Sequence, residues 1–140
     1  GRGCWEKYGS ASALIQLARL EMERDRSSEM WTITDGDSFK VSGRTPFQAA
    51  RLGDAAAKRV LTSYLQGLSI GMINLVNIIQ PEIICLGGGV SNAEDDLLLD
   101  PLRELVWRGS FDKSHHTRIE KASLGNDAGV VGAALLCNLV

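Results

Sequence analysis

The sequence predicts an α/β fold that is rich in helices and has few strands. Three observations carry this prediction. Apolar residues recur at helical spacing over residues 55–80, a short β-branched run follows at 82–86, and that run ends directly in three glycines. A helix, a second short strand and a final helix come next, and this alternation is typical of an α/β layer.

The composition describes one globular unit. Its 140 residues are 44% hydrophobic and 23% charged, with a net charge of −2, and no basic face provides what binding to a phosphate backbone requires. No stretch approaches the roughly 18 apolar residues of a membrane span. Cys4, Cys85 and Cys137 form no regular framework, and the last two lie in apolar runs where a thiol acts as a small hydrophobe. We expect a cytoplasmic protein that binds neither nucleic acid nor membrane.

The first third of the chain predicts one clear helix and one irregular segment. Apolar residues between Leu14 and Met22 recur at helical spacing, which predicts a helix over about 12–25 with Ser10 as its N-cap. Residues 27–43 alternate weakly around an Asp-Gly-Asp sequence, which favours a loop with a small hairpin. A short helix should follow, with Thr45 as its N-cap and a proline at its first position.

Asp54 is placed to cap a long helix that runs to Pro81. Its apolar stripe steps by three and four residues over about five turns. The stripe consists of Leu61, Leu65, Leu68, Met72, Leu75 and Ile79. Gly67 and Gly71 lie one turn apart on this helix, and because glycine costs about 1 kcal/mol against alanine in a helix interior, they predict the close approach of another helix. The stripe fits a homodimer surface and a central core helix equally well.

The last third alternates strands and helices. A buried strand is expected at 82–86, and a helix at about 93–108, where the one proline marks either a kink or a restart. Residues 117–122 predict a second strand. A final helix should be capped by Asn126 or Asp127.

Three glycines are the first candidate for a binding site. Gly87, Gly88 and Gly89 follow a strand and precede a helix, which is where open α/β sheets bind ligands, and glycines let the backbone approach a ribose or phosphate closely. A tight turn without a ligand explains them equally well, since the sequence is neither the dinucleotide-binding fingerprint nor a phosphate-binding P-loop.

Isolated polar residues give weaker signals. Cys4 would supply one ligand where a zinc site needs about four, so by itself it fits a buried thiol better. Glu6 stands before a helix, where a carboxylate either stabilises the helix dipole, the more economical interpretation, or accepts hydrogen bonds from a hydroxylated ligand. His115 and His116 are adjacent in a polar segment, which indicates a solvated loop.

Taken in order, three stretches resemble a known family. GRGCWEKYGSASAL, GMINLVNIIQPEIICLGGGVSNA and ASLGNDAGVVGAALL are similar to the carboxyl half of the ROK family of sugar kinases and repressors, and to its glucokinase-like members in particular. The resemblance covers almost the whole chain. It implies an actin-like, ribonuclease H-like ATPase fold and the phosphorylation of a hexose by ATP with Mg2+. Glucose, and with it a place in glycolysis, is the expectation for this branch.

The resemblance also implies roles for particular residues. Cys4 resembles the last cysteine of the family's structural Zn2+ motif, and Glu6 resembles the glutamate that accepts hydrogen bonds from sugar hydroxyls. Gly87, Gly88 and Gly89 resemble the loop that receives the nucleotide. A nucleotide contact by the residues that open the last helix, from Asn126 to Ala128, is a weaker implication.

The family comparison further implies a division of the chain. Residues 1–125 should belong to the large carboxyl-terminal lobe, and residues 126–140 to the helix that links back to an amino-terminal lobe. The family's phosphate loop and catalytic aspartate motif do not occur here, so we expect a fragment with no catalytic base and no hexokinase turnover of its own. The whole protein should be a homodimer. The alternative function is the sugar-sensing domain of a ROK-family transcriptional repressor.

Overall fold

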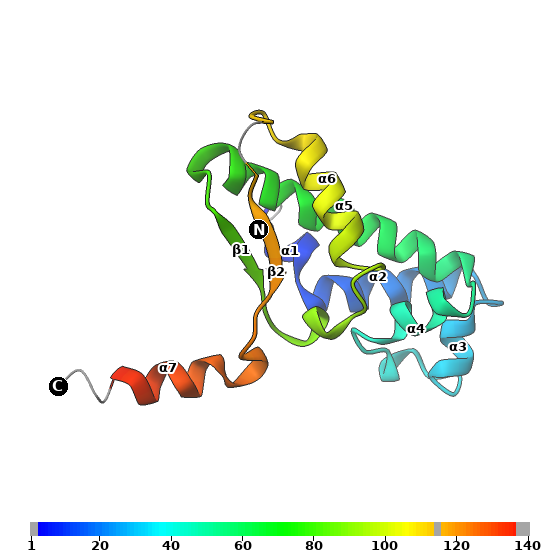
Figure 1. The fold of residues 1–140 in the computed structure, drawn as a ribbon. Coiled ribbons are helices and arrows are strands. Elements are labelled where there is room, and N and C mark those ends of the chain that lie inside the picture. Colours follow the sequence, from blue (N-terminus) through cyan, green and yellow to red (C-terminus); the bar gives the residue numbers. More distant parts are fainter. Residues whose placement is uncertain (1–2, 114–115, 137–140) are drawn as a thin grey trace.

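The computed structural model describes residues 3–113 and 116–136. Helices form most of it, and two strands pair beside them (Figure 1). The helices are α1 (Glu6–Gly9), α2 (Ala11–Arg24), α3 (Glu29–Ile33), α4 (Thr45–Arg51), α5 (Ala55–Ile79), α6 (Leu99–Gly109) and α7 (Ala128–Leu136). The strands are β1 (Ile83–Leu86) and β2 (Arg118–Lys121), and the short 3-10 turns are Ser38–Lys40, Gly89–Asn92 and Gly125–Asp127. The predicted helix-rich α/β fold with few strands is confirmed.

The first predicted helix is confirmed as α2. The Ser10 hydroxyl accepts a hydrogen bond from the Ala13 amide at 3.1 Å, which satisfies one of the free donors at the helix start. Leu14, Ala18 and Met22 are fully buried on one face of α2, and this face packs against α5. Capping and helical periodicity therefore fix this element locally.

The hairpin predicted in residues 27–43 is wrong. The segment forms α3 and a 3-10 turn instead, because its polar side chains cap helical turns. The Ser28 hydroxyl accepts from the Met30 amide at 3.2 Å, and an Asp37 carboxylate oxygen accepts from the Phe39 amide at 2.8 Å. The prediction of Thr45 as N-cap is also wrong by one position, since α4 begins at Thr45 and its hydroxyl accepts from the Ser42 amide at 3.0 Å.

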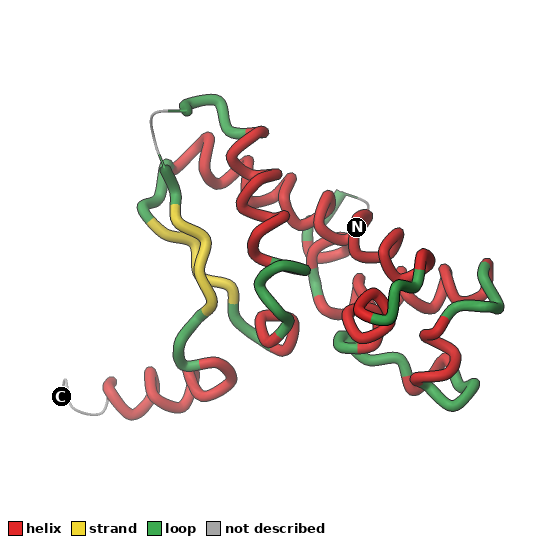
Figure 2. The backbone as a smooth tube through the Cα atoms, turned by 45° about the vertical axis from the view of Figure 1, so that its right-hand side comes forward, coloured by secondary structure: helices red, strands yellow, loops and turns green. Residues whose placement is uncertain are grey.

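Helix α5 forms the centre of the core. Asp54 caps it as predicted, accepting from the Ala56 amide at 2.7 Å. Helices α1, α2, α4 and α6 all contact α5, which is the arrangement expected of a central core helix (Figure 2). The predicted stripe is buried only as far as Met72. Leu75 and Ile79 are exposed, because the buried face shifts to Val76 near the end of the helix.

The two strands form a parallel pair. Ile83 lies opposite Arg118 and Leu86 opposite Lys121. The expected burial of the first strand is wrong: Ile83 is 40% exposed and Cys85 is exposed, so this thiol is not the buried hydrophobe predicted. Among the described residues no further strand pairs with β1, and helices cover the pair only in part, so most of its side chains keep contact with solvent while Ile119 is buried.

Helix α6 begins later than the sequence suggests, whereas α7 begins where it is expected. Helix α6 starts at Leu99, so the proline at 101 lies in its first turn, where a missing amide hydrogen breaks no intrahelical bond. The helix predicted over 93–98 is wrong, because these residues form turns, so the proline marks neither a kink nor a restart. Helix α7 begins at Ala128, directly after Asp127, and extends away from the rest of the molecule (Figure 1). Within the described residues, no helix combines the length and the apolar character that crossing a membrane requires.

Candidate nucleotide and sugar site

The three glycines form an open turn at the carboxyl end of β1. Gly88 has a φ of 81°, a backbone conformation that glycine adopts without strain. A Cβ added to Gly88 or Gly89 would meet no atom within 4 Å, so the backbone here is accessible to another molecule. The hydroxyl of the buried Ser91 donates to the Gly88 carbonyl at 2.7 Å and closes the turn.

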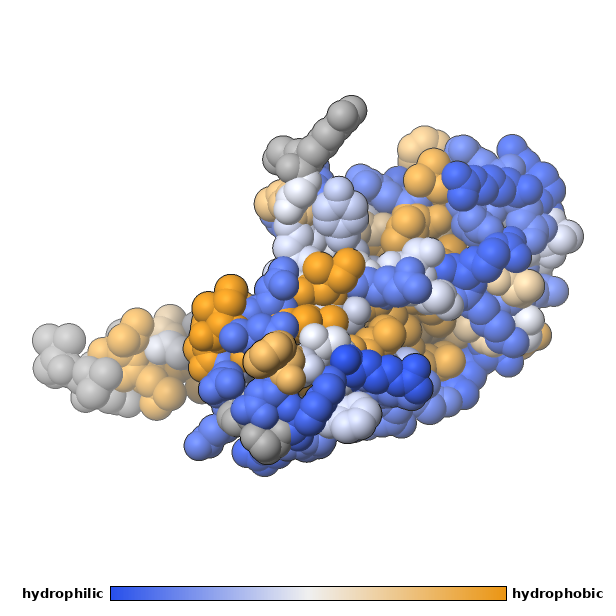
Figure 3. All heavy atoms as spheres, turned by 90° about the horizontal axis from the view of Figure 1, so that it is seen from above, coloured by the Kyte–Doolittle hydropathy of each residue, from blue (hydrophilic) through white to orange (hydrophobic). Residues whose placement is uncertain are grey.

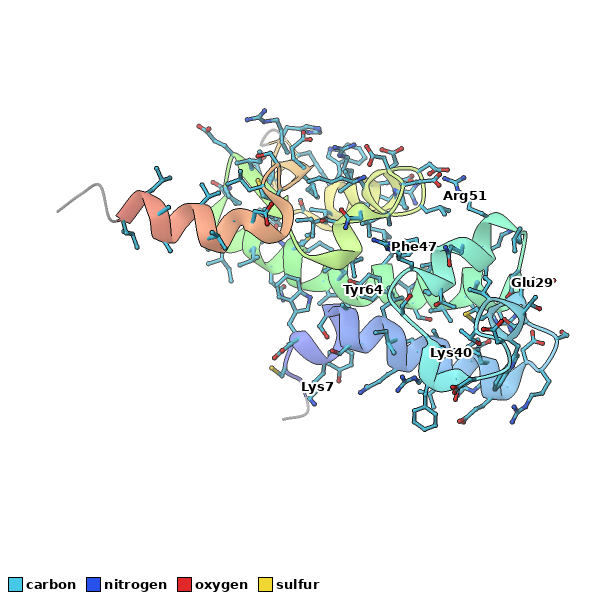
Figure 4. All side chains as sticks on the ribbon, turned by 90° about the horizontal axis from the view of Figure 1, so that it is seen from below. Lys7, Glu29, Lys40, Phe47, Arg51 and Tyr64 are labelled. Carbon is cyan, nitrogen blue, oxygen red and sulfur yellow. The ribbon has the colours of Figure 1, made fainter. Side chains whose placement is uncertain are left out.

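The larger of two hollows beside this turn lies between the turn and α4. It has a volume of about 640 Å³. Phe47 forms its apolar floor, Arg44 and Arg51 contribute cationic side chains, and Val90 and Ala93 line the opposite side. Figure 4 shows Phe47 and Arg51 along α4. A planar apolar group fits the floor, and Arg44 offers a cation to an anion, whereas Arg51 is paired with Glu94 and Asp96.

The smaller hollow lies on the other side of the same turn. Its volume is about 190 Å³, and it extends from the three glycines to Gly9, Ser10 and Ala11 at the junction of α1 and α2. Tyr64 of α5 borders it, and burial raises the pKa of this phenol to about 12. The glycine turn thus separates the cleft beside α4 from the short helix that carries Glu6.

Ionic contacts tie the segment after the glycine turn to its neighbours. Arg51 of α4 pairs with both Glu94 and Asp96. The Lys121 ammonium of β2 donates to the Ala93 carbonyl at 2.7 Å and pairs with Asp95 at 2.5 Å. The hydrogen bond from Arg51 is the main reason that the pKa of Asp96 lies below its usual value. These contacts hold both rims of the larger cleft.

The structure places Cys4 and Glu6 at the exposed start of α1. Cys4 is a free, exposed thiol, not the buried one that its isolated position favours. No group of three or more His, Cys, Asp or Glu residues that would hold a metal occurs within residues 3–113 and 116–136. One cysteine does not fit a zinc ion by itself, so Cys4 as a zinc ligand stays a prediction. His116 is exposed, and His115 lies outside the described residues.

Sequence reasoning missed most of the cleft. Phe47 and Arg51 lie on α4 far from the glycines in sequence, and no local motif marks them as lining residues. The glycine pair on α5 did predict a close approach, and this prediction is confirmed. The segment that approaches is α1, through Trp5 and Tyr8.

The sequence profile of the ROK family matches residues 1–139. The chain belongs to the ROK family. Glucokinase from Streptomyces coelicolor is 34% identical over 143 residues, which cover 95% of this chain and 43% of the glucokinase. A putative xylose repressor from Caldicellulosiruptor sp. is 30% identical over 138 residues, which cover 96% of this chain and 33% of the repressor. This ROK-family chain therefore spans less than half the length of these relatives.

A solved structure supports the same assignment. The crystal structure of a ROK family glucokinase from Streptomyces griseus, in complex with glucose and AMPPNP, superposes with a TM-score of 0.85 at 31% identity. The superposition covers 97% of this ROK-family chain and 45% of the glucokinase chain. The predicted actin-like ATPase fold is confirmed by this likeness.

Proposed function

We propose that this ROK-family chain provides the nucleotide site and part of the sugar site of an ATP-dependent hexose kinase, with glucose as the hexose. One observation carries the proposal. The open glycine turn lies between a cleft that fits a nucleotide base and a hollow that leads to the helix carrying Glu6. Binding of AMPPNP and glucose by the Streptomyces griseus relative supports it.

The nucleotide occupies the larger cleft. Its base packs on the apolar floor at Phe47, and its phosphates cross the exposed backbone of Gly88 and Gly89 towards the smaller hollow. Glycine permits this close passage because no side chain stands in the way. Arg44, at the edge of the cleft, adds a cation near the phosphates. Mg2+, when bound, neutralises phosphate charge.

The sugar lies on the α1 side of the turn. Glu6 is exposed, and its carboxylate accepts hydrogen bonds from sugar hydroxyls. In the transfer, a sugar hydroxyl oxygen forms a bond to the γ-phosphorus, the bond from that phosphorus to the bridging oxygen of ADP breaks, and the hydroxyl proton passes to a base. We assign that base to no residue of this chain. Positioning and charge stabilisation are what these residues contribute.

The activity is tested with the complete protein that carries this chain. Incubation with ATP and glucose should produce ADP and a glucose phosphate in equal amounts, and the sugar-free reaction is the control. Fructose and mannose, tested in parallel, decide between glucose and other hexoses. If no hexose raised ADP formation above the sugar-free rate, the kinase proposal would be wrong.

A repressor's sugar-sensing domain is the second candidate. It is favoured by the match to the putative xylose repressor, which covers 96% of this chain. The gene sequence upstream of Gly1 separates the two functions, because a winged helix there would indicate a repressor. Sugar-dependent DNA binding without ATP consumption would support the same conclusion. A cytoplasmic location and a homodimer belong to both candidates.

A further inference from the structure

Helix α1 is too short to position Glu6 by itself. It consists of four residues and buries none of them, and an isolated helix of this length is not stable in water. Its position is therefore set by what it contacts, and those contacts are with α5 and α2. The residues that fix α1 against α5 also fix Glu6.

The contact at the start of α1 is made by Trp5. The indole Nε1 donates to the Gly67 carbonyl at 3.0 Å. The ring lies directly on α5 at Gly71, where an added Cβ would lie 1.9 Å from the Cε2 atom of Trp5. No side chain larger than hydrogen fits at position 71 while the indole occupies this place. The glycine is thus a recess for the tryptophan.

Two further contacts lie on the same face of α5. A Cβ on Gly67 would lie 3.0 Å from the Cβ of Tyr8, so this glycine also lets α1 approach. The hydroxyl of Tyr64 donates to the Gly9 carbonyl at 3.1 Å, at the end of α1 (Figure 4). Positions 64, 67 and 71 are spaced by three and four residues, which places them on one side of a helix. Trp5 and Gly9 therefore anchor α1 on both sides of Glu6.

We propose that Trp5 and Gly71 are positioning residues that fix the Glu6 carboxylate for sugar binding. This inference rests on the proposed function, because it assumes that Glu6 binds sugar. Neither residue is required to touch the substrate. Trp5 acts through α1, and Gly71 acts by leaving space for the indole. The nucleotide cleft lies beside α4 and the glycine turn, so its affinity should not depend on this contact.

The test uses variants of the complete protein that carries this chain. Gly71→Ala places a methyl group where the indole lies and should raise the KM for sugar about tenfold, since displacing a binding group by even 1 Å is costly. The KM for ATP should stay within about twofold. Direct titration with the sugar in the absence of ATP gives the same comparison without catalysis.

A second substitution separates positioning from misfolding. Trp5→Leu removes the ring that the new methyl group would strike, so Gly71→Ala should have almost no effect on sugar affinity in the Trp5→Leu background. Trp5→Ala removes the anchor at a residue that is 39% exposed, and it should raise the sugar KM while the protein remains folded. Lys7→Ala, at an exposed position of the same helix, is the matched control and should change neither KM.

The outcomes distinguish the two proposals. If the unsubstituted protein binds sugar and Gly71→Ala and Trp5→Ala leave its affinity unchanged, the positioning inference is wrong and the kinase proposal stands. The positioning inference is also wrong if Gly71→Ala lowers the affinity for sugar equally with tryptophan or with leucine at position 5. If the unsubstituted protein binds no sugar, the kinase proposal fails and the inference fails with it.

Discussion

The buried side chain of Tyr64 borders the smaller hollow and holds the end of α1. It is 2% exposed, its hydroxyl holds the end of α1 through Gly9, and it borders the hollow beneath the glycine turn. A deprotonated phenol here would be a charge removed from water, which is why burial raises the pKa of Tyr64 to about 12. The neutral hydroxyl is therefore the form that anchors α1.

The raised pKa of Tyr64 predicts a loss of stability at high pH. An unfolded tyrosine has a pKa of about 10, so between pH 10 and about 12 the unfolded chain has released a proton that the folded chain retains. The contribution of neutral Tyr64 to the free energy of unfolding is fully present below pH 10. It is lost as the pH rises towards about 12, so the free energy of unfolding falls through this window. Denaturant titrations at several pH values should show a shallower fall for Tyr64→Phe.

Exposed Tyr8 provides the control for this experiment. Tyr8→Phe removes a phenol that is not buried, so its stability should fall with pH as steeply as that of the unsubstituted protein. Equal slopes for Tyr64→Phe and the unsubstituted protein would contradict the burial argument.

At the scale of elements, Arg51 joins α4 to the segment that follows the glycine turn. It pairs with Glu94 and Asp96, and all three side chains are exposed, so solvent screens the pairs and their contribution to stability is small. The two ion pairs instead set the position of α4 relative to the segment after the glycine turn. They connect the two rims of the cleft that we assign to the nucleotide.

Removal of the Arg51 guanidinium should raise the pKa of Asp96. Its hydrogen bond is the largest cause of the lowered value, so Arg51→Ala should return the Asp96 titration towards the ordinary range near 3.9. The pKa of Asp96 is lower in the folded than in the unfolded protein. The pair with Arg51 therefore stabilises the fold when the pH is above the unfolded pKa, and this stabilisation is lost as the pH falls through the folded pKa. NMR titration of the side-chain carboxyl carbon measures the shift directly.

Asp25 is the matched control for the Asp96 titration. Its pKa is also lowered, chiefly by hydrogen bonds from Ser27, with a smaller contribution from Arg59. Arg51→Ala should leave the titration of Asp25 unchanged. An Asp96 titration that did not move would show that Arg51 does not hold this side of the cleft in solution.

The elements that sequence predicted well are those with local signals. Asp54 caps α5 through backbone amides two and three residues away, and the buried stripe follows from spacing alone as far as Met72. The hairpin predicted in residues 27–43 failed because Ser28 and Asp37 satisfy nearby amides, which weak alternation of apolar residues does not reveal. The exposure of β1 also escaped prediction, because burial of a strand depends on what covers it.

The same distinction applies to the candidate site. The three glycines could be singled out from the sequence because a residue type with special backbone freedom marks the place, and their role in binding stays a prediction. Phe47 lines the cleft only because α4 folds across to the turn, and Trp5 meets Gly71 across 66 positions, so neither contact has a local signature. The spacing of Gly67 and Gly71 predicted that something approaches α5. It did not predict which segment.

At the scale of the whole molecule, the described part leaves a large apolar surface uncovered. Figure 3 shows hydrophobic colour along α7 and the neighbouring part of the surface. Val130, Leu135 and Leu136 of this helix are all more than half exposed. Apolar surface of this kind is typical of a packing interface. Residues 89–92 of the glycine turn contact residues 125–127 at the start of this helix. Helix α4 and the end of α1 line the hollows beside the same turn.

In the proposed complex, the nucleotide crosses the exposed backbone of the glycine turn. A valine at position 89 would meet no protein atom within 4 Å of its Cβ, so Gly89→Val should leave the protein folded while its side chain occupies the path of the phosphates. Ser63→Val adds the same side chain at an exposed position of α5 and is the control.

The proposed path of the phosphates is tested by the KM for ATP of Gly89→Val in the complete protein, compared with its KM for sugar. We predict that the KM for ATP rises at least about tenfold, the KM for sugar stays within about twofold, and Ser63→Val changes neither. An unchanged KM for ATP in the folded Gly89→Val protein would contradict the claim.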